Sequence, residues 1–173
     1  MPITPDTKDW TWVLERPCEA CGFNAQEYPP ETFSRTIREN AAKWIPVLER
    51  DGAAVRPSDD RWSALEYACH VRDVYRVFDE RLRLMLEEDG PVFQNWDQDE
   101  TAIEERYELQ MPAIVSGELL DAAGAYADRF DSVEPTQWDR PGTRSNGSHF
   151  TVQSLGTYGL HDPMHHLWDV GTF

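Results

Sequence analysis

Apolar residues recur at helical spacing in four segments of the chain: residues 31–50, residues 63–88, residues 113–130 and a segment that begins near Thr151. The first segment has an apolar face made of Phe33, Ile37, Ala41, Trp44 and Leu48. Intervals of three and four residues keep side chains on one side of an α-helix, so the pattern predicts four helices. Pro46 interrupts the first of them, which is compatible with a kink or an early end of that helix.

The starts of two of these helices carry specific signals. Ser63 and Glu66 fit the capping-box pattern, in which each side chain binds the backbone N–H of the other residue. Trp62 and Tyr67 fit the hydrophobic contact that often flanks such a cap. Thr151 is a good N-cap for the fourth helix. These signals predict helix starts at residues 63 and 151.

The fold class predicted from these elements is all-α, a four-helix bundle with a long loop between helices two and three. The long loop covers residues 89–111, and residues 99–107 are expected to form a short extra helix within it. Residues 1–30 are expected to be an N-terminal extension that packs on the bundle, and residues 31–173 the bundle domain. Long loops in compact domains often cover functional sites, so this loop is a candidate cover.

Composition excludes several classes of partner. The 173 residues include 40% hydrophobic residues, enough for a buried core, and carry a formal net charge of -16. This acidity opposes binding to nucleic acid or to an anionic membrane surface, since both require neutralisation of phosphates. No apolar run approaches the roughly 20 residues of a membrane span, and the N-terminal sequence does not match a signal peptide. Three cysteines, an odd number, indicate no disulfide framework, so we expect a soluble cytoplasmic protein.

Three of the five histidines lie close together in the sequence HDPMHH. His161 and His165 are four residues apart, so on a helix both imidazoles project from one face and can share a metal ion. His166 points about 100° away and is a weaker ligand candidate. His70 lies on the apolar, inward-facing side of the second helix and is expected to supply a third ligand. Three imidazoles with open coordination positions are typical of a catalytic metal site.

Pro163 lies between these histidines and allows two local structures. A continuous helix would be kinked here, because proline clashes with the carbonyl of residue 159, which is Gly159 in this chain. Alternatively, one helix ends here and a second begins with Asp162 as N-cap and Pro163 as its first residue. The second structure loosens the geometry of the histidine pair, and the continuous, kinked helix is favoured.

Other residues near the predicted ligands are candidate helpers. Asp73 and Asp162 are close to them along the helices, and either carboxylate could orient an imidazole from the second coordination shell. A solvated helix face explains both carboxylates at least as well. Tyr158 and Trp168 flank the histidine pair, and Trp96 lies in the long loop. These aromatic residues favour a pocket for an organic molecule, although core packing explains them almost as well.

A second motif, RPCEACGF, contains Cys18 and Cys21. A C-x-x-C pair followed by glycine is half of a zinc ribbon, but the third cysteine, Cys69, lies inside the second helix and does not complete it. A thioredoxin-like redox pair would need a βαβ context, which the predicted elements do not provide. The favoured interpretation is a loop that packs on the bundle.

Three features of the sequence carry a resemblance to a known family. They are the segments RWSALEYACHVRDV and LHDPMHHLWDV, and the spacing of about ninety residues between His70 and His161. In these features the chain resembles the DinB/YfiT-like superfamily, four-helix bundles described as metalloenzymes. The resemblance extends from about Glu31 to the C-terminus. It also includes FTVQSLGTYGL and, more loosely, NWDQDETAIEERY.

This resemblance implies a divalent metal, with zinc or nickel favoured, bound by three histidines that correspond to His70, His161 and His165. Some relatives act on low-molecular-weight thiols, so the resemblance favours a thiol-dependent transferase with a small-molecule substrate and a thiol cosubstrate. A metal-dependent hydrolase and a non-catalytic metal- or ligand-binding protein remain alternatives. Family members often pair, so a homodimer is compatible with the resemblance. The family name implies no DNA chemistry.

Overall fold

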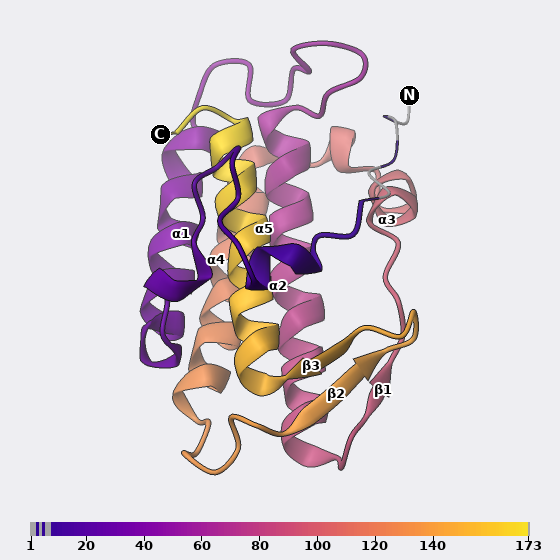
Figure 1. Ribbon diagram of the computed structural model, residues 1–173. Coiled ribbons are helices and arrows are strands. Elements are labelled where there is room, and N and C mark those ends of the chain that lie inside the picture. The colour runs from indigo at the N-terminus through magenta and orange to yellow at the C-terminus, as the bar shows by residue number, and fades with distance from the viewer. Residues whose placement is uncertain (1–2, 4, 6–7, 173) are drawn as a thin grey trace.

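The computed structural model describes residues 3, 5 and 8–172. Four long helices form the bundle: α1 (Phe33–Leu48), α2 (Ala64–Glu87), α4 (Pro112–Asp131) and α5 (Val152–Asp169). Helix α4 packs against α1 and α2, and α5 packs against the same two helices (Figure 1). Each helix begins within two residues of its predicted start. The predicted four-helix bundle with a long loop between its second and third helices is therefore confirmed.

The predicted helix caps are present. The backbone N–H of Ser63 donates to Oε2 of Glu66 over 2.9 Å, and the backbone N–H of Glu66 donates to Oγ of Ser63 over 3.2 Å. Thr151 forms a second capping box at the start of α5, with Ser154 as its partner. These reciprocal bonds satisfy N–H groups that a helix start otherwise leaves unpaired.

Two prolines, Pro46 and Pro163, lie inside continuous helices. Pro46 is within α1 and Pro163 is within α5, so the favoured continuous form of the fourth helix is confirmed.

Gly159 has a second role besides easing the proline clash. A Cβ atom at this position would lie 2.6 Å from Cδ1 of Phe78 and 2.9 Å from the hydroxyl of Tyr126. Glycine therefore allows α5 to approach its neighbours closely, which fixes the position of this helix against α2.

A small sheet closes one end of the bundle. It contains β1 (Val92–Phe93), β2 (Pro141–Arg144) and β3 (His149–Thr151), with β1 parallel and β3 antiparallel to β2. The sheet ties the long loop after α2 to the hairpin before α5. The sequence pattern showed this hairpin only as a turn-rich segment, because its strands are too short to display alternation.

The long loop contains the expected short helix, α3 (Gln98–Glu104), followed by the 3-10 turn η4 (Tyr107–Leu109). Within the described part of the chain, no helix is long and apolar enough to cross a membrane.

The N-terminal segment contains three further 3-10 turns: η1 (Thr11–Leu14), η2 (Ala25–Glu27) and η3 (Pro30–Thr32). It runs across the face of α5, as the indigo ribbon shows (Figure 1). Its side chains Val13, Cys18 and Phe23 are at most 3% exposed and belong to the hydrophobic core. The N-terminal segment is thus packed on the bundle.

Candidate metal centres

Helix α5 directs potential metal ligands into two separate groups. The first, here called the His/Asp group, consists of His70, Asp162 and His166. The second, called the Cys/His group, consists of Cys18, Cys21, His161 and His165. Within each group, all ligand atoms lie within 4.8 Å of one another.

The three histidines predicted to bind one metal are divided between these groups. His161 and His165 share one face of α5, as expected, but that face meets the N-terminal segment. The adjacent face, about 100° around the helix, carries Asp162 and His166 and meets His70 of α2. Both pairs have the four-residue spacing of neighbours on a helix face, so the spacing alone could not identify the pair that faces α2.

In the His/Asp group, two imidazoles converge on one carboxylate oxygen. Nε2 of His70 lies 3.0 Å from Oδ1 of Asp162, and Nε2 of His166 lies 3.5 Å from the same oxygen. Ligands about 2.1 Å from a shared cation, at angles of 90–110°, are separated by about 3.0–3.4 Å. The spacing and the donor types therefore fit a divalent cation.

Charge and exposure also suit Asp162 as an anionic ligand. Burial alone would raise its pKa, but the imidazoles of His70 and His166 outweigh that effect and hold the pKa below its usual value. The Asp162 side chain is 34% exposed, whereas that of His70 is fully buried. The group therefore has a buried imidazole on its α2 side and a partly exposed aspartate side chain on α5.

Asp169 lies between the two groups. Its Oδ2 atom is 2.8 Å from Nδ1 of His166 and 3.9 Å from Nε2 of His165. A carboxylate that accepts a hydrogen bond from one ring nitrogen fixes the orientation of the ring and makes the other nitrogen a better ligand. The prediction missed Asp169, although its i,i+3 spacing from His166 was a signal in the sequence.

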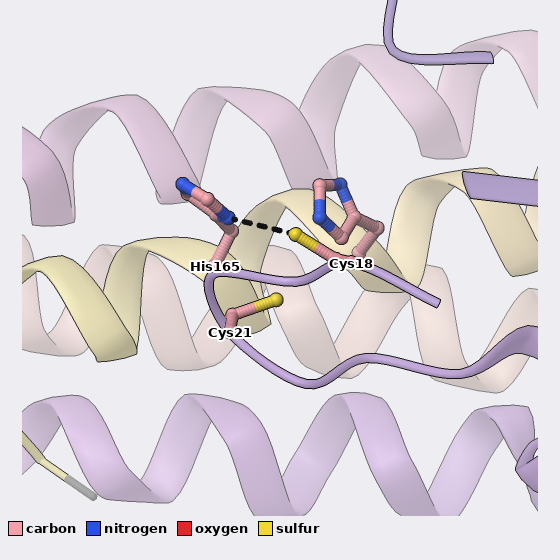
Figure 2. Close-up of side chains that lie close together, drawn as sticks. Cys18, Cys21 and His165 are labelled. Atoms are coloured by element: carbon pink, nitrogen blue, oxygen red, sulfur yellow. Dashed lines mark hydrogen bonds between the residues drawn. The ribbon is translucent and has the colours of Figure 1, made fainter. Parts of the chain in front are cut away.

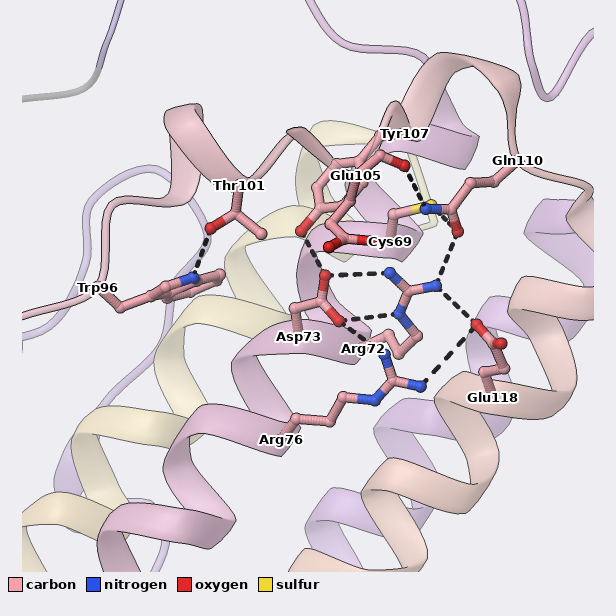
Figure 3. Close-up of polar contacts among 10 residues, drawn as sticks. All are labelled: Cys69, Arg72, Asp73, Arg76, Trp96, Thr101, Glu105, Tyr107, Gln110 and Glu118. Carbon is pink, nitrogen blue, oxygen red and sulfur yellow. Dashed lines mark hydrogen bonds and ion pairs between the residues drawn. The ribbon is translucent and has the colours of Figure 1, made fainter. Parts of the chain in front are cut away.

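Aromatic rings surround the His/Asp group. The Trp96 ring stacks on His70 with centroids 5.6 Å apart and planes at 4°, and Tyr67 lies 4.9 Å from His166. The indole N–H of Trp96 donates to Oγ1 of Thr101 in α3 over 2.8 Å (Figure 3). The long loop thus delivers an aromatic side chain to this group.

Asp73, a predicted second-shell residue, is held in a different network. Its carboxylate accepts hydrogen bonds from Arg72, from Arg76 over 3.0 Å and from the hydroxyl of Tyr107 (Figure 3). Arg72 also binds Glu118 of α4 over 2.6 Å. These bonds connect α2 to η4 and α4, so Asp73 supports the long loop. Asp162 does contact an imidazole, but as a member of the His/Asp group itself.

The predicted pocket residues Tyr158 and Trp168 lie in different environments. The Tyr158 ring packs on Phe78 and Phe150, with centroid distances of 5.9 and 5.4 Å. Trp168 is 42% exposed, and its ring lies 5.4 Å from that of His165. Trp168 therefore borders the Cys/His group, and Tyr158 packs among core aromatics.

The Cys/His group joins the N-terminal segment to α5. Sγ of Cys18 lies 3.7 Å from Nδ1 of His165, and Cys21 lies beside them (Figure 2). Burial raises the pKa of the Cys21 thiol to about 11 and lowers the pKa of His161 to about 4. At neutral pH the His161 imidazole is therefore uncharged, which is the form that binds metals.

Comparison with known proteins identifies the family of this chain and a solved structure of similar fold. A sequence profile of the DinB superfamily matches residues 28–170. The chain belongs to the DinB superfamily. Among solved structures it is similar to YfiT from Bacillus subtilis, described as a probable metal-dependent hydrolase with an unusual four-helix bundle topology. The two chains are 17% identical, the match covers 80% of this chain and 82% of YfiT, and the TM-score is 0.72. No curated protein matches the sequence closely enough to add a further relative.

The two groups relate differently to the DinB superfamily match. All of the His/Asp group lies within residues 28–170, whereas Cys18 and Cys21 precede the match. The resemblance implied three histidine ligands, but the group that joins α2 to α5 contains two histidines and a carboxylate. The Cys/His group thus combines residues of α5 inside the match with two cysteines that precede it.

Proposed function

We propose that this protein is a metal-dependent enzyme that acts on a small molecule, with a divalent cation held by His70, Asp162 and His166. The observation that carries this proposal is the convergence of two imidazole Nε2 atoms on one oxygen of a partly exposed carboxylate. Two imidazoles and a carboxylate are the ligands of several catalytic metal sites, which keep positions open for water or substrate. Zinc or nickel suits this ligand set.

The bound cation would lower the pKa of a coordinated water or thiol and so supply a nucleophile at neutral pH. The side chains position this chemistry. Asp169 accepts a hydrogen bond from Nδ1 of His166 and thereby turns Nε2 toward Asp162. Trp96 and Tyr67 offer aromatic surface beside the open edge of the group, where an organic substrate can pack.

Hydrolysis is the favoured reaction, because the structurally similar YfiT is described as a probable metal-dependent hydrolase. Transfer of a low-molecular-weight thiol is the second candidate. It is favoured by the aromatic surface next to the group and by the family resemblance, and it would use the same open positions. The two reactions differ in whether turnover requires an added thiol.

Elemental mass spectrometry and activity panels test the proposal. The wild-type protein is compared with His70→Ala and with a matched control, His149→Ala, whose exposed imidazole bonds to Thr143. We expect His70→Ala to lose one metal equivalent and the metal-dependent turnover of ester, amide or thiol-acceptor substrates. We expect His149→Ala to retain both. Equal metal content in His70→Ala and wild type would rule out this cation site. Metal at the site without turnover of any substrate would show a binding protein.

A further inference from the structure

We infer that Cys18, Cys21, His161 and His165 bind a zinc ion in a closed structural site that fastens the N-terminal segment to α5. This site shares no ligand with the His/Asp group. It therefore stands or falls independently of the proposed enzymatic function.

The ligand atoms are already close together. All four lie within 4.8 Å of one another, and Sγ of Cys18 is 3.7 Å from Nδ1 of His165 (Figure 2). With Zn–S near 2.3 Å and Zn–N near 2.0–2.1 Å, a tetrahedral site separates sulfur from nitrogen by about 3.6 Å. The Cys18–His165 pair thus has the spacing of two zinc ligands, and the other two side chains are within reach of the same ion.

The backbone around the cysteines forms a tight turn. The N–H of Cys18 donates to the carbonyl of Phe23 over 2.8 Å, and the N–H of Gly22 donates to the carbonyl of Cys18 over 2.8 Å. Gly22 has φ +75°, in the left-handed region that favours glycine. This turn holds both thiols near the helix. Combined with His161 and His165, they give the C-x2-C and H-x3-H spacings found in Cys2His2 zinc sites.

A buried nitrogen in the group lacks a partner. His161 is 4% exposed, and among the described residues its Nε2 atom has no hydrogen-bond partner. Buried polar atoms in native proteins are nearly always satisfied, so this atom requires an explanation. Coordination of a metal ion at the imidazole provides one.

The surroundings are those of a closed site. The Trp10 ring lies 5.4 Å from the His161 ring and 5.2 Å from the His165 ring, and Phe23 lies 5.3 Å from His161. Cys18 is 2% exposed. Four protein ligands under an aromatic cover leave no position for substrate, which is characteristic of structural zinc. Two thiolates and two imidazoles in tetrahedral geometry favour zinc over magnesium, calcium or manganese.

The position of the group suggests what the ion does. The two cysteines precede the region that matches the DinB superfamily, whereas both histidines lie in α5. The ion would therefore connect the N-terminal segment, which precedes the match, to the bundle. It would replace contacts between thiols and imidazoles with four metal–ligand bonds.

Cobalt(II) substitution in the full-length, reduced protein tests the site. Only an ion bound by cysteine sulfur gives a thiolate-to-cobalt charge-transfer band in the near ultraviolet. We expect this band in the wild type and in His70→Ala, a weaker band in Cys18→Ser and in Cys21→Ser, and its loss when both cysteines are replaced by serine. Cys69→Ser is the matched control, since Cys69 lies in α2 outside the group, and it should keep the band. Added zinc should bleach the band, because zinc outcompetes cobalt at such sites.

A second measurement does not depend on the folding of the cysteine variants. X-ray absorption at the zinc edge of zinc-loaded His70→Ala protein should show two sulfur and two nitrogen ligands. A shell of nitrogen and oxygen alone, or no thiolate band in cobalt-loaded wild type, would overturn the inference. If wild type and His70→Ala both give the band but the wild type shows no metal-dependent turnover, the zinc site stands and the proposed function fails. Metal-dependent turnover by the wild type without a thiolate band would support the proposed enzyme and rule out the structural zinc site.

Discussion

The two ligand groups occupy adjacent faces of the same turns of α5, yet they differ in burial, charge and covering. The Cys/His group presents thiols and an uncharged imidazole beneath Trp10 and the N-terminal segment. The His/Asp group presents an ionised carboxylate, 34% exposed, beside the long loop. The first arrangement suits an ion that holds structure, and the second suits an ion that meets substrate.

The difference arises from what each face meets. A step of one residue rotates a side chain by about 100° around the helix, so HDPMHH can serve two neighbours at once. One face meets a cysteine turn and the other meets His70. Asp169 lies 2.8 Å from His166 and 3.9 Å from His165, so it contacts one group more strongly than the other.

Loss of the proposed structural zinc should have the largest effect on stability. An ion whose free concentration exceeds its Kd about 1,000-fold stabilises the folded state by about 4 kcal/mol. For a chain of this size, that corresponds to a decrease in Tm of about 8–16 °C. We expect Cys18→Ser with Cys21→Ser, or zinc chelation, to produce this decrease in a thermal melt. An unchanged Tm in both would contradict a structural role for the Cys/His group.

Substitution of the His/Asp ligands should instead affect activity. Loss of an outer-shell partner typically costs 10–100-fold in metal affinity or activity, so removal of a direct ligand should cost more than about 100-fold. We expect this loss in His70→Ala and Asp162→Asn, with a smaller change in Tm than the cysteine variants show. Asp162→His should retain the cation site, because it replaces the carboxylate ligand with a third imidazole. Steady-state kinetics and elemental analysis measure both effects.

Asp73→Asn should reduce stability without removing either metal. Asp73 is buried, with 8% of the residue exposed, and the bonds of its carboxylate to Arg72, Arg76 and Tyr107 should contribute about 2 kcal/mol. Burial alone would raise its pKa, but these partners hold the pKa below its usual value. The contribution is therefore present above the unfolded pKa of about 3.9 and is lost as pH falls through the lower folded pKa.

Urea unfolding measures this contribution as the difference between wild type and Asp73→Asn. We expect the difference to shrink as pH falls from about 7 to about 3. A difference that does not vary with pH would show that Asp73 acts through packing instead of charge.

Asp169→Asn is expected to have the smallest effect, and it compares the two groups within one variant. The weaker acceptor should reduce activity about 10-fold, because it no longer orients His166 as firmly. The cobalt–thiolate band of the Cys/His group should persist, because the contact of Asp169 with this group, to Nε2 of His165, is 3.9 Å long. Equal losses of metal from both groups would show that Asp169 couples them.

The sequence alone determined the bundle and much of the chemistry. Its apolar spacing predicted the four helices, and the Ser63–Glu66 pattern predicted a cap that the structure contains. The continuous helix through Pro163 was also predicted correctly. These features depend on residues that are close in sequence, where propensity and periodicity act directly.

Only the tertiary structure decided how the ligands are grouped. The rotation of α5 depends on its packing against α2 and α4, where Phe78 of α2 and Tyr126 of α4 lie close to Gly159. That rotation brings Asp162 and His166 to His70. It also turns His161 and His165 toward Cys18 and Cys21. Cys18 and His165, which are in contact, are 147 residues apart in the sequence. Residues so far apart have no local signal that pairs them. Packing of the whole chain therefore determines which imidazoles meet α2 and which meet the N-terminal segment.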